Sequence, residues 1–549
     1  MCGNAKSLFA YLLTAILFLS LVVFAASVPA QVLWQTGHAE QRSDYKSNSV
    51  ENPADKMSWT AWYKDPRAKY GPEWHASTVD KDGNVIAVGT SADQVSSPVA
   101  GDMILGKFNK DGQMLPGWPK NNSAAGKRFN EGQRVVVDAA GNITVAGYTI
   151  SDTTPRHWYF TVWRFDSNGN LQPGWPQFPD NTEAYGTGVV IDSNGDIVCC
   201  GGNTSNGKMM LVKYQQNGSL VAGWPQTYQV SGQSTFAYSL IQDSDGNYVV
   251  AGFTSVTGVF NALLYKLDIN GNVLAGWPKT WHSETTGVDE YCAVSQDTNG
   301  DYCLVGVSQG ATPASGGRLL VTRYSKEGEQ LTSAGWPQIF QRDGYRDNWV
   351  DVWRGSVDPS GNIAAAVTCD SGATVYTVKY KRDGTMFYGF PRIFNRAGYS
   401  GETRSCGVDG QGNIYTVGYS RSDATPDDDY STFVIKYPPE YVWYLAEGST
   451  GSDSRGSFET WVLVQNPTDE TANVQLYYQT PAGEVTGHKI TLAPHTRETR
   501  NVADFVPNEW SVSTKVVSDR AVIAERAMYW STSTGVYRES AHDSIGYDP

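Results

Sequence analysis

The chain has 549 residues and a formal net charge of −14, with no block of basic residues. This charge excludes nucleic acids and anionic membrane surfaces as expected partners. The length is ample for two domains, and a composition rich in Gly, Trp and Tyr with only 18% charged residues indicates an exported, all-β protein.

Residues 1–30 have the pattern of an export signal. Lys6 supplies the positive start, residues 8–26 are apolar, and Val28-Pro29-Ala30 offers a small-residue cleavage site. The alternative is an uncleaved membrane anchor, because the apolar run is long. Cleavage predicts a secreted or cell-surface protein with no membrane insertion of the mature chain, beginning with a polar segment over 31–56.

A long repeat occupies residues 57–437. Each copy begins with a turn in which Gly is followed by Asn or Asp, as tight hairpin turns require. An alternating strand follows, as in Val85–Thr90, and then a basic-aromatic strand such as Val212–Tyr214. Most copies run on to Gly-Trp-Pro or a close variant. The turn glycines of the seven copies are Gly83, Gly141, Gly195, Gly246, Gly300, Gly361 and Gly412.

The repeat predicts a seven-bladed β-propeller. The spacings of 51 to 61 residues accommodate four short strands, which is one propeller blade. Proline cannot donate to a strand ladder, so the strand at Gly-Trp-Pro belongs on the outer edge of its blade. The seventh copy lacks this strand, and we expect residues 57–63 to supply it and to close the ring.

The copies resemble the bacterial seven-bladed β-propeller repeat families. The resemblance rests on stretches such as Asp80–Thr90 followed by Lys107–Phe108, which match a D-x-x-GN-x-x-V-x-G-x-T stretch and then a K-Y/F stretch. It covers 57–437 and implies the fold. It implies no activity, because propellers include both binding modules and enzymes.

After a short linker at 438–442, the pattern changes to alternating strands over 443–549. About seven strands in this length predict a β-sandwich of the immunoglobulin-like kind. The stretch also resembles a module of secreted prokaryotic proteins, which implies an extracellular accessory domain. The resemblance is carried by Trp443–Gly448, Trp461–Pro467, Glu525–Trp530 and His542–Gly546.

Two constellations suggest ligands or cross-links. The turns place oxygens at i, i+2 and i+4, as in Asp80, Asp82 and Asn84, like the first ligands of a calcium loop. The twelfth position holds an uncharged residue, so we expect Asx-capped turns, with no metal and no cofactor. Among the cysteines, Cys292 and Cys303 are the favoured disulfide pair, and buried free thiols are the alternative.

The candidate binding residues lie in the connections that lead from one blade to the inner strand of the next. These connections gather at the channel mouth of a propeller and carry aromatic and charged side chains, which suit sugar rings or a polar peptide. The longest spans 341–353. The predicted ligand-binding residues are Trp74, His75, Tyr185, Trp281, His282, Glu290, Tyr345, Arg346, Trp349, Trp353 and Glu402.

The sequence contains no short hydrolase motif such as G-x-S-x-G or H-E-x-x-H. The main prediction is therefore a non-catalytic binding or adhesion protein for carbohydrate or protein. One alternative is a polysaccharide-acting enzyme, a glycosidase or a lyase, with Glu290, Asp347 or Glu402 as acid/base, because carboxylate enzymes leave no short motif. A structural surface-layer component is the other alternative.

Overall fold

The structure is a computed structural model. It describes residues 59–65, 70–92, 100–179, 183–283, 287–310, 317–340, 355–369, 374–387, 390–424, 430–439, 441–454, 456–468, 471–532 and 538–546. The chain divides into two compact units, Met1–Tyr437 and Pro438–Pro549. Each unit is described separately.

Both units are built from β-strands, and the all-β fold class is confirmed. The described residues contain no α-helix, only the short 3₁₀ turns η3 (Thr332–Ala334) and η5 (Val502–Asp504). No helix of the described part is long and apolar enough to cross a membrane.

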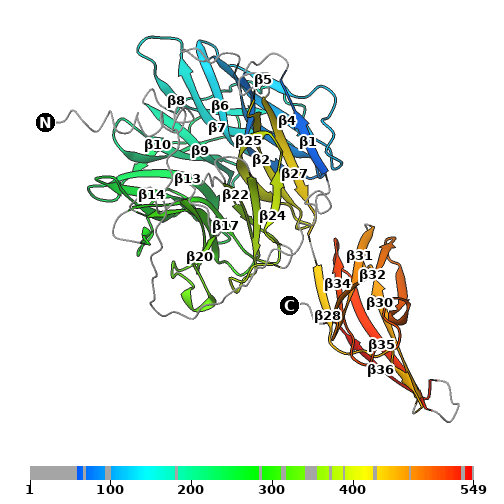
Figure 1. Cartoon of the computed structure of the whole chain (residues 1–549). Coiled ribbons are helices and arrows are strands. Elements are labelled where there is room, and N and C mark those ends of the chain that lie inside the picture. Colours follow the sequence, from blue (N-terminus) through cyan, green and yellow to red (C-terminus); the bar gives the residue numbers. More distant parts are fainter. Residues whose placement is uncertain are drawn as a thin grey trace, which may run out of the picture. The chain divides into compact units, whose positions relative to one another are not determined.

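The first unit repeats one antiparallel motif of an inner, a second, a third and a short outer strand (Figure 1). The inner strands are β2 (Tyr70–Val79), β6 (Lys127–Val137), β9 (Ala184–Ile191), β13 (Ser234–Gln242), β17 (Gly287–Gln296), β21 (Gly355–Val357) and β25 (Tyr399–Val408). The second strands are β3 (Val85–Ala92), β7 (Ile143–Ser151), β10 (Ile197–Asn203), β14 (Tyr248–Val256), β18 (Tyr302–Gly310), β22 (Ile363–Cys369) and β26 (Ile414–Ser422).

The remaining strands complete the motif toward the outside. The third strands are β4 (Gly101–Phe108), β8 (Trp158–Phe165), β11 (Lys208–Tyr214), β15 (Val259–Leu267), β19 (Gly317–Tyr324), β23 (Thr374–Tyr380) and β27 (Tyr430–Tyr437). The outer strands are β5 (Lys120–Asn122), β12 (Gln226–Tyr228), β16 (Lys279–Trp281), β20 (Gln338–Phe340) and β24 (Arg392–Asn395), joined by β1 (Trp59–Tyr63).

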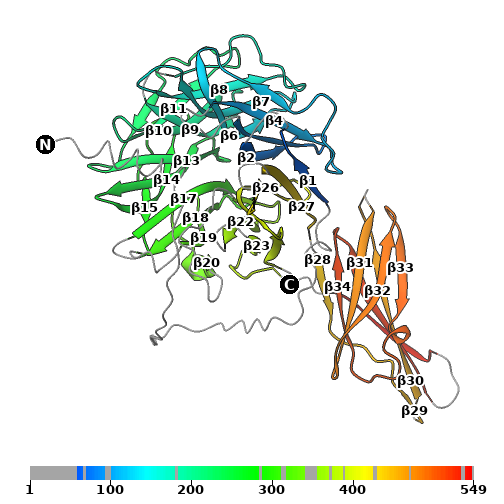
Figure 2. The same ribbon diagram turned by 45° about the horizontal axis from the view of Figure 1, so that its top comes forward.

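The inner strands of successive motifs contact one another, and β25 contacts β2. Figure 2 shows the motifs of this unit fanning out around a common centre, a propeller-like arrangement. The inner strands therefore surround the centre of this unit, and we call the region that they enclose the channel.

Strand β1 completes the last motif, as predicted. It pairs antiparallel with β27, with Trp59 opposite Lys436 and Tyr63 opposite Thr432. Ala61 is buried in a core that also contains Trp74 and Val434. The N-terminal strand thus joins the first motif to the last.

The Asp of each turn and the basic residue of each third strand explain the repeat signature. Asp192 Oδ1 accepts hydrogen bonds from the backbone N–H groups of Asn194 and Asp196, both at 2.9 Å. Its Oδ2 lies 2.8 Å from Lys213 Nζ and accepts a 2.7 Å bond from the Tyr248 hydroxyl of the next motif. The expected Asx-capped turns are confirmed, and they also connect neighbouring motifs.

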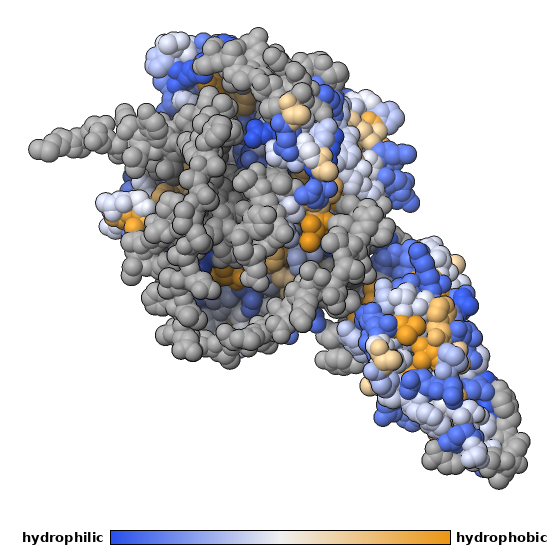
Figure 3. Space-filling model, in the orientation of Figure 1, coloured by the Kyte–Doolittle hydropathy of each residue, from blue (hydrophilic) through white to orange (hydrophobic). Residues whose placement is uncertain are grey.

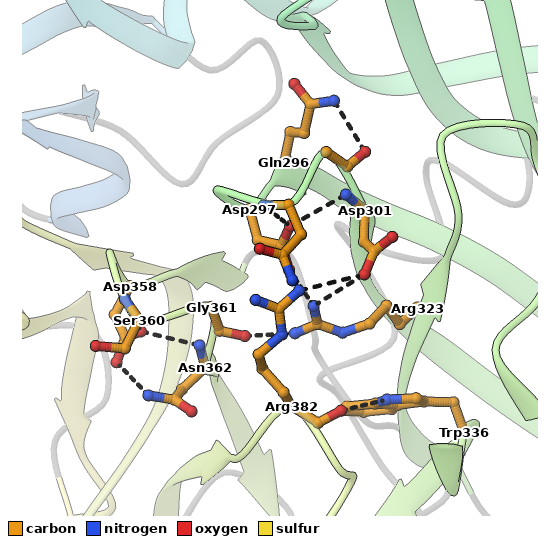
Figure 4. Close-up of polar contacts among 12 residues, drawn as sticks. Gln296, Asp297, Asp301, Arg323, Trp336, Asp358, Ser360, Gly361, Asn362 and Arg382 are labelled. Carbon is orange, nitrogen blue, oxygen red and sulfur yellow. Dashed lines mark hydrogen bonds and ion pairs between the residues drawn. The ribbon is translucent and has the colours of Figure 1, made fainter. Parts of the chain in front are cut away.

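The Gly-Trp-Pro tryptophan makes a second connection between motifs. Trp336 Nε1 donates to the Arg382 carbonyl oxygen at 3.0 Å, 46 residues further along the chain. Figure 4 shows Arg323 and Arg382 converging on Asp297 and Asp301 beside this bond. Arg323 is buried and reaches the Gly361 carbonyl of the next motif. These contacts stabilise the boundary between motifs on the side away from the functional residues described below.

The second unit contains two antiparallel sheets. One has the order β28-β34-β31-β32, and the other has the order β29-β30-β35-β36 with β33 beside β30. The strands are β28 (Tyr441–Leu445), β29 (Ser452–Asp453), β30 (Gly456–Gln465), β31 (Ala472–Thr480), β32 (Gly483–Leu492), β33 (Arg497–Asn501), β34 (Ser513–Ser518), β35 (Ile523–Thr532) and β36 (Ser540–Ile545). Both sheets contribute to one core, with Val474 and Leu476 from one and Val462 and Val464 from the other. Figure 3 shows that the visible face of this unit is largely hydrophilic, with a smaller apolar area.

Candidate active site

A β-bulge shapes the inner strand in most motifs of the first unit. The register between inner and second strand skips one residue near the middle of the inner strand, so that residue has no partner, and β2 and β6 have a further shift at their start. The bulged residues are His75, Gln133, Thr187, Tyr238, Cys292 and Arg404. Strand residues two apart point to the same face, so the residue two positions before each bulge shares the bulge's side of the strand.

A glycine of the second strand accommodates each bulge. A Cβ atom at this glycine would lie 1.7 to 2.0 Å from the carbonyl oxygen of the residue sixteen positions earlier, which no side chain allows. The glycines are Gly89, Gly147, Gly201, Gly252, Gly306 and Gly418, and the opposing residues are Glu73, Glu131, Tyr185, Phe236, Glu290 and Glu402. The Val-x-Val-Gly stretch of the repeat is thus explained by close backbone approach.

Four of these six equivalent positions are glutamates: Glu73, Glu131, Glu290 and Glu402. Because the positions are equivalent in the motif, the four carboxyl groups belong to one level of the channel wall. Glutamates are rarely buried without a partner, and three of these four share His75 or Arg404 as a partner.

One side of the channel holds a connected network. His75 is buried, and its Nδ1 and Nε2 lie 3.1 Å from Glu131 and 3.3 Å from Glu73. Glu131 also accepts a 2.7 Å hydrogen bond from the Tyr148 hydroxyl. Arg404 Nη2 lies 2.7 Å from Glu402 and 3.9 Å from Glu73. Strands β25, β2, β6 and β7 are therefore joined by alternating acids and bases.

The network fixes protonation states. Burial alone would lower the pKa of His75, but the charge and hydrogen bond of Glu131 and the bond to Glu73 raise it to about 9. Burial would raise the pKa of Glu131, but His75 and Tyr148 hold it below its usual value. At neutral pH His75 is an imidazolium between Glu131 and Glu73, and Glu131 is a carboxylate.

Glu290 stands apart from this network. Burial raises its pKa to about 7, against the opposing effect of a hydrogen bond from the Tyr238 side chain, and the neighbouring Asp289 raises it further. Glu290 therefore gains and loses its proton near neutral pH. It is a candidate general acid at the same level as carboxylates that are ion-paired.

Four predicted site residues lie within inner strands, whereas the sequence analysis placed them in the connections that lead to those strands. His75 is a bulged residue, and Tyr185, Glu290 and Glu402 lie opposite the strand glycines. The Tyr185 ring packs edge-on against Tyr148 with centroids 5.0 Å apart.

Trp74 is not a ligand-binding residue. Its exposed fraction is 0%, and its ring packs between Tyr63 and Phe108. Adjacent strand residues face opposite sides, so Glu73 and His75 face the channel while Trp74 enters the core.

Trp281 and His282 lie away from the inner strands' glutamate level. Trp281 ends the outer strand β16, opposite Ala262, and packs against a buried core. His282 Nδ1 lies 2.6 Å from the fully buried Asp289, whose carboxylate also accepts bonds from Ser283. This pair holds the connection entering β17 in place.

Tyr345, Arg346, Trp349, Trp353 and the alternative acid Asp347 lie outside the described residues. Cys292 and Cys303 are both free and buried, so the favoured disulfide is wrong. Cys303 pairs across the strands with Ser295, whereas Cys292 is the bulged residue. No group of three or more His, Cys, Asp or Glu in the described part could hold a metal ion.

Sequence reasoning missed Glu73, Glu131, Gln133, Tyr148 and Tyr238. A usable signal exists for the glutamates: each stands sixteen positions before the strand glycine of its copy. Counting back from those glycines identifies all four glutamates.

No family model matches the chain, and no curated protein matches it. Solved structures with a similar fold include a protein of unknown function from Dyadobacter fermentans, at 11% identity and a TM-score of 0.41, covering 69% of this chain and 98% of that one. A polysaccharide lyase matches at 12% identity and a TM-score of 0.40, covering 68% and 90%. An exo-β-1,3-galactanase from Phanerochaete chrysosporium matches at 10% identity and a TM-score of 0.30, covering 75% and 95%.

The prediction of a non-catalytic binding or adhesion protein is corrected by these findings. Two of the three similar structures named above are polysaccharide-acting enzymes, a lyase and a galactanase. At such identities and TM-scores the likeness describes the fold alone. The activity is therefore argued from the channel residues.

Proposed function

We propose that the protein is an exported enzyme that hydrolyses glycosidic bonds of a polysaccharide in the central channel of its first unit. The observation that carries this proposal is the contrast between Glu290, whose pKa is raised to about 7, and the ion-paired glutamates at the same channel level. A glycosidase needs at least two carboxyl groups, one that is protonated and one that is ionised.

Glu290 is the general acid in this proposal. It gives its proton to the glycosidic oxygen as the bond from that oxygen to the anomeric carbon breaks. A water molecule attacks the anomeric carbon and loses its proton to the carboxylate of Glu402 or Glu73. These two side chains are 29% and 25% exposed, so water reaches them.

Arg404 and His75 position the base side. Arg404 contacts both Glu402 and Glu73, and His75 connects Glu73 to the buried Glu131. Fixed partners of this kind hold a carboxylate in one orientation and lower the cost of reorganisation during the reaction. Tyr148 and Tyr185 supply aromatic surface beside the network, which suits a sugar ring.

The architecture assigned to this enzyme is a seven-bladed propeller followed by a β-sandwich. Seven repeats, the N-terminal strand that completes the last motif, and the resemblance to bacterial seven-bladed repeat families support the ring. The domain limits 57–437 and 443–549 and an extracellular location belong to the same proposal. The signal-like residues 1–30 support the location.

The test is turnover of a polysaccharide panel by the mature chain and by Glu290→Gln. We expect reducing ends to appear with the native chain and activity to fall as pH rises through about 7, because the general acid loses its proton there. Glu290→Gln should lose at least ~10²-fold in kcat. Glu329→Gln, an exposed turn substitution, is the matched control and should keep full activity.

Product mass separates the outcomes. Products heavier than the parent units by one water support hydrolysis. Products with unsaturated ends would show that the enzyme cleaves by elimination instead. Absence of turnover across neutral and acidic polysaccharides, with a folded chain, would contradict the enzyme proposal.

A further inference from the structure

Arg134 on β6 is a half-buried arginine of the first unit, and its surroundings differ from those of the buried Arg164 and Arg323. Arg164 lies 2.6 Å from Asp138, and Arg323 lies on Asp297. Arg134 has no carboxylate partner among the described residues. Its recorded hydrogen bond runs from Nη2 to the carbonyl oxygen of Tyr238, at 3.3 Å.

The location of Arg134 is the channel. It follows the bulged Gln133 on β6, and its guanidinium reaches β13, two motifs away. Arg164, Arg323 and Arg526 each have one side-chain nitrogen that is fully enclosed and makes no hydrogen bond. No nitrogen of Arg134 is in this state. The remaining N–H groups of Arg134 therefore have access to the channel.

Tyr238 brings Arg134 to the proposed general acid. The Tyr238 carbonyl accepts from Arg134, and the Tyr238 side chain is hydrogen-bonded to Glu290. The two channel residues thus share one neighbour on β13. The buried thiols Cys200 and Cys292 complete the surroundings, and neither offers a negative charge to Arg134, because burial raises the pKa of Cys200 to about 12.

We propose that Arg134 receives the carboxylate of a sugar acid, so that the substrate of the channel is a polysaccharide containing uronic acid residues. This rests on the proposed function and names its substrate class. A planar guanidinium with accessible N–H groups matches a carboxylate with two parallel hydrogen bonds.

The charges in the channel also decide on which side the acidic sugar binds. Glu73, Glu131 and Glu402 lie on the side that His75 and Arg404 occupy, and added negative charge is disfavoured there. Glu290 carries less negative charge near neutral pH than an ordinary glutamate, and Arg134 carries a positive charge, so the side shared by Glu290, Tyr238 and Arg134 is more favourable to an anion. The acidic sugar therefore lies on the general-acid side.

Burial lowers the pKa of Arg134 to about 9, with the two cysteines acting in the opposite direction. Arg134 keeps its positive charge at neutral pH, and the absence of an acidic neighbour is what makes its burial costly. An anionic ligand removes this cost on binding.

The experiment measures binding in the full mature chain carrying Glu290→Gln, so that turnover does not interfere. Isothermal titration compares an oligogalacturonate with the same oligomer as its methyl ester. We expect the acid to bind at least ~10-fold more tightly, in line with a charged hydrogen-bonded pair. Arg134→Gln should remove that preference, and Arg134→Lys should restore part of it.

Arg497→Gln removes the same single charge from an exposed position of the second unit and should leave the preference unchanged. Thermal melts of every variant confirm that it is folded. Equal affinities for acid and ester, or a preference that survives Arg134→Gln, would overturn the proposal. So would Arg134-dependent binding of a sulfated neutral oligomer without binding of the uronate, because the anion would then be a sulfate.

The two proposals fail separately. Arg134-dependent binding without any turnover would contradict the hydrolase proposal and support the uronate site. Turnover of neutral chains with no effect of Arg134→Gln would remove the uronate site and keep the hydrolase.

Discussion

At the scale of residues, four glutamates occupy equivalent positions on four inner strands, but their surroundings differ. Glu131 is buried against an imidazolium, Glu73 and Glu402 share Arg404, and Glu290 is half-buried beside a tyrosine hydroxyl. The neighbours at the bulge, two residues further on, make the difference. The chemistry of the channel is therefore decided by pairs of side chains on inner strands.

His75 gives a stability prediction at this scale. Its pKa is about 9 in the folded chain and near 6.5 when unfolded, so the folded state binds the proton more tightly. The resulting stability is fully present below pH 6.5 and is lost as pH rises toward and through 9. We expect the free energy of unfolding to fall by roughly 2–3 kcal/mol across this window.

Denaturant unfolding between pH 6 and 10 measures this slope, and His75→Gln should flatten it. The exposed His157→Gln is the control and should leave the slope as it is in the native chain. An equal slope in the native and His75→Gln proteins would show that His75 is not an imidazolium held by Glu131 and Glu73.

At the scale of elements, the bulge and its facing glycine form one unit of two strands. The inner strand bends to present its side chains to the channel, and the second strand loses a side chain to make room. The repeat preserves this device even where the channel residue is aromatic, as at Tyr185. The glycine therefore belongs to the scaffold, and the residue opposite it belongs to the site.

Gly306→Ala tests the device. Its Cβ would lie 1.8 Å from the Glu290 carbonyl oxygen, so the bulge of β17 must shift. We expect a loss of about 2–4 kcal/mol in the free energy of unfolding, together with loss of turnover. Gly407→Ala on β25 meets nothing within 4 Å and should change stability by no more than ~0.5 kcal/mol.

Chemical denaturation gives both values. If Gly306→Ala were as stable as Gly407→Ala, the strand glycine would serve only to complete a turn-strand pattern, and the explanation of the Val-x-Val-Gly stretch would be wrong.

Much of the strand arrangement could be predicted from the sequence. Turn glycines, alternating valines and Gly-Trp-Pro define the strands because hairpin turns and edge strands accept few residue types. The channel side chains were less accessible, since a bulge shifts the alternation by one residue and hides which residues face inward. Trp74 was assigned to the ligand for this reason, although its neighbours Glu73 and His75 face the channel.

At the scale of the whole molecule, closure depends on a strand more than 360 residues distant from its partner. Strand β1 pairs with β27, and Trp62 packs against Phe394 and Phe433 of the last motifs. Motifs that contact only their neighbours need such a closure, because an open ring has two free ends.

Deletion of Trp59–Tyr63 should lower the melting temperature by about 5 °C or more, because Ala61 leaves a buried core and β27 becomes an edge strand. Differential scanning calorimetry measures the change. Deletion of five residues from the polar 31–56 segment is the length-matched control. An unchanged melting temperature after loss of β1 would show that β27 closes the ring without a partner.

The glycines of the second strands have a consequence for how such proteins diversify. They hold the backbone of the wall constant, whatever side chain stands opposite, so Glu73, Glu131, Tyr185, Phe236, Glu290 and Glu402 are exchangeable positions on a fixed frame. A change of substrate then requires substitution at a few positions, which are found in the sequence by counting sixteen residues back from each strand glycine. The same count offers a ready library design for altering the specificity of the channel without rebuilding its fold.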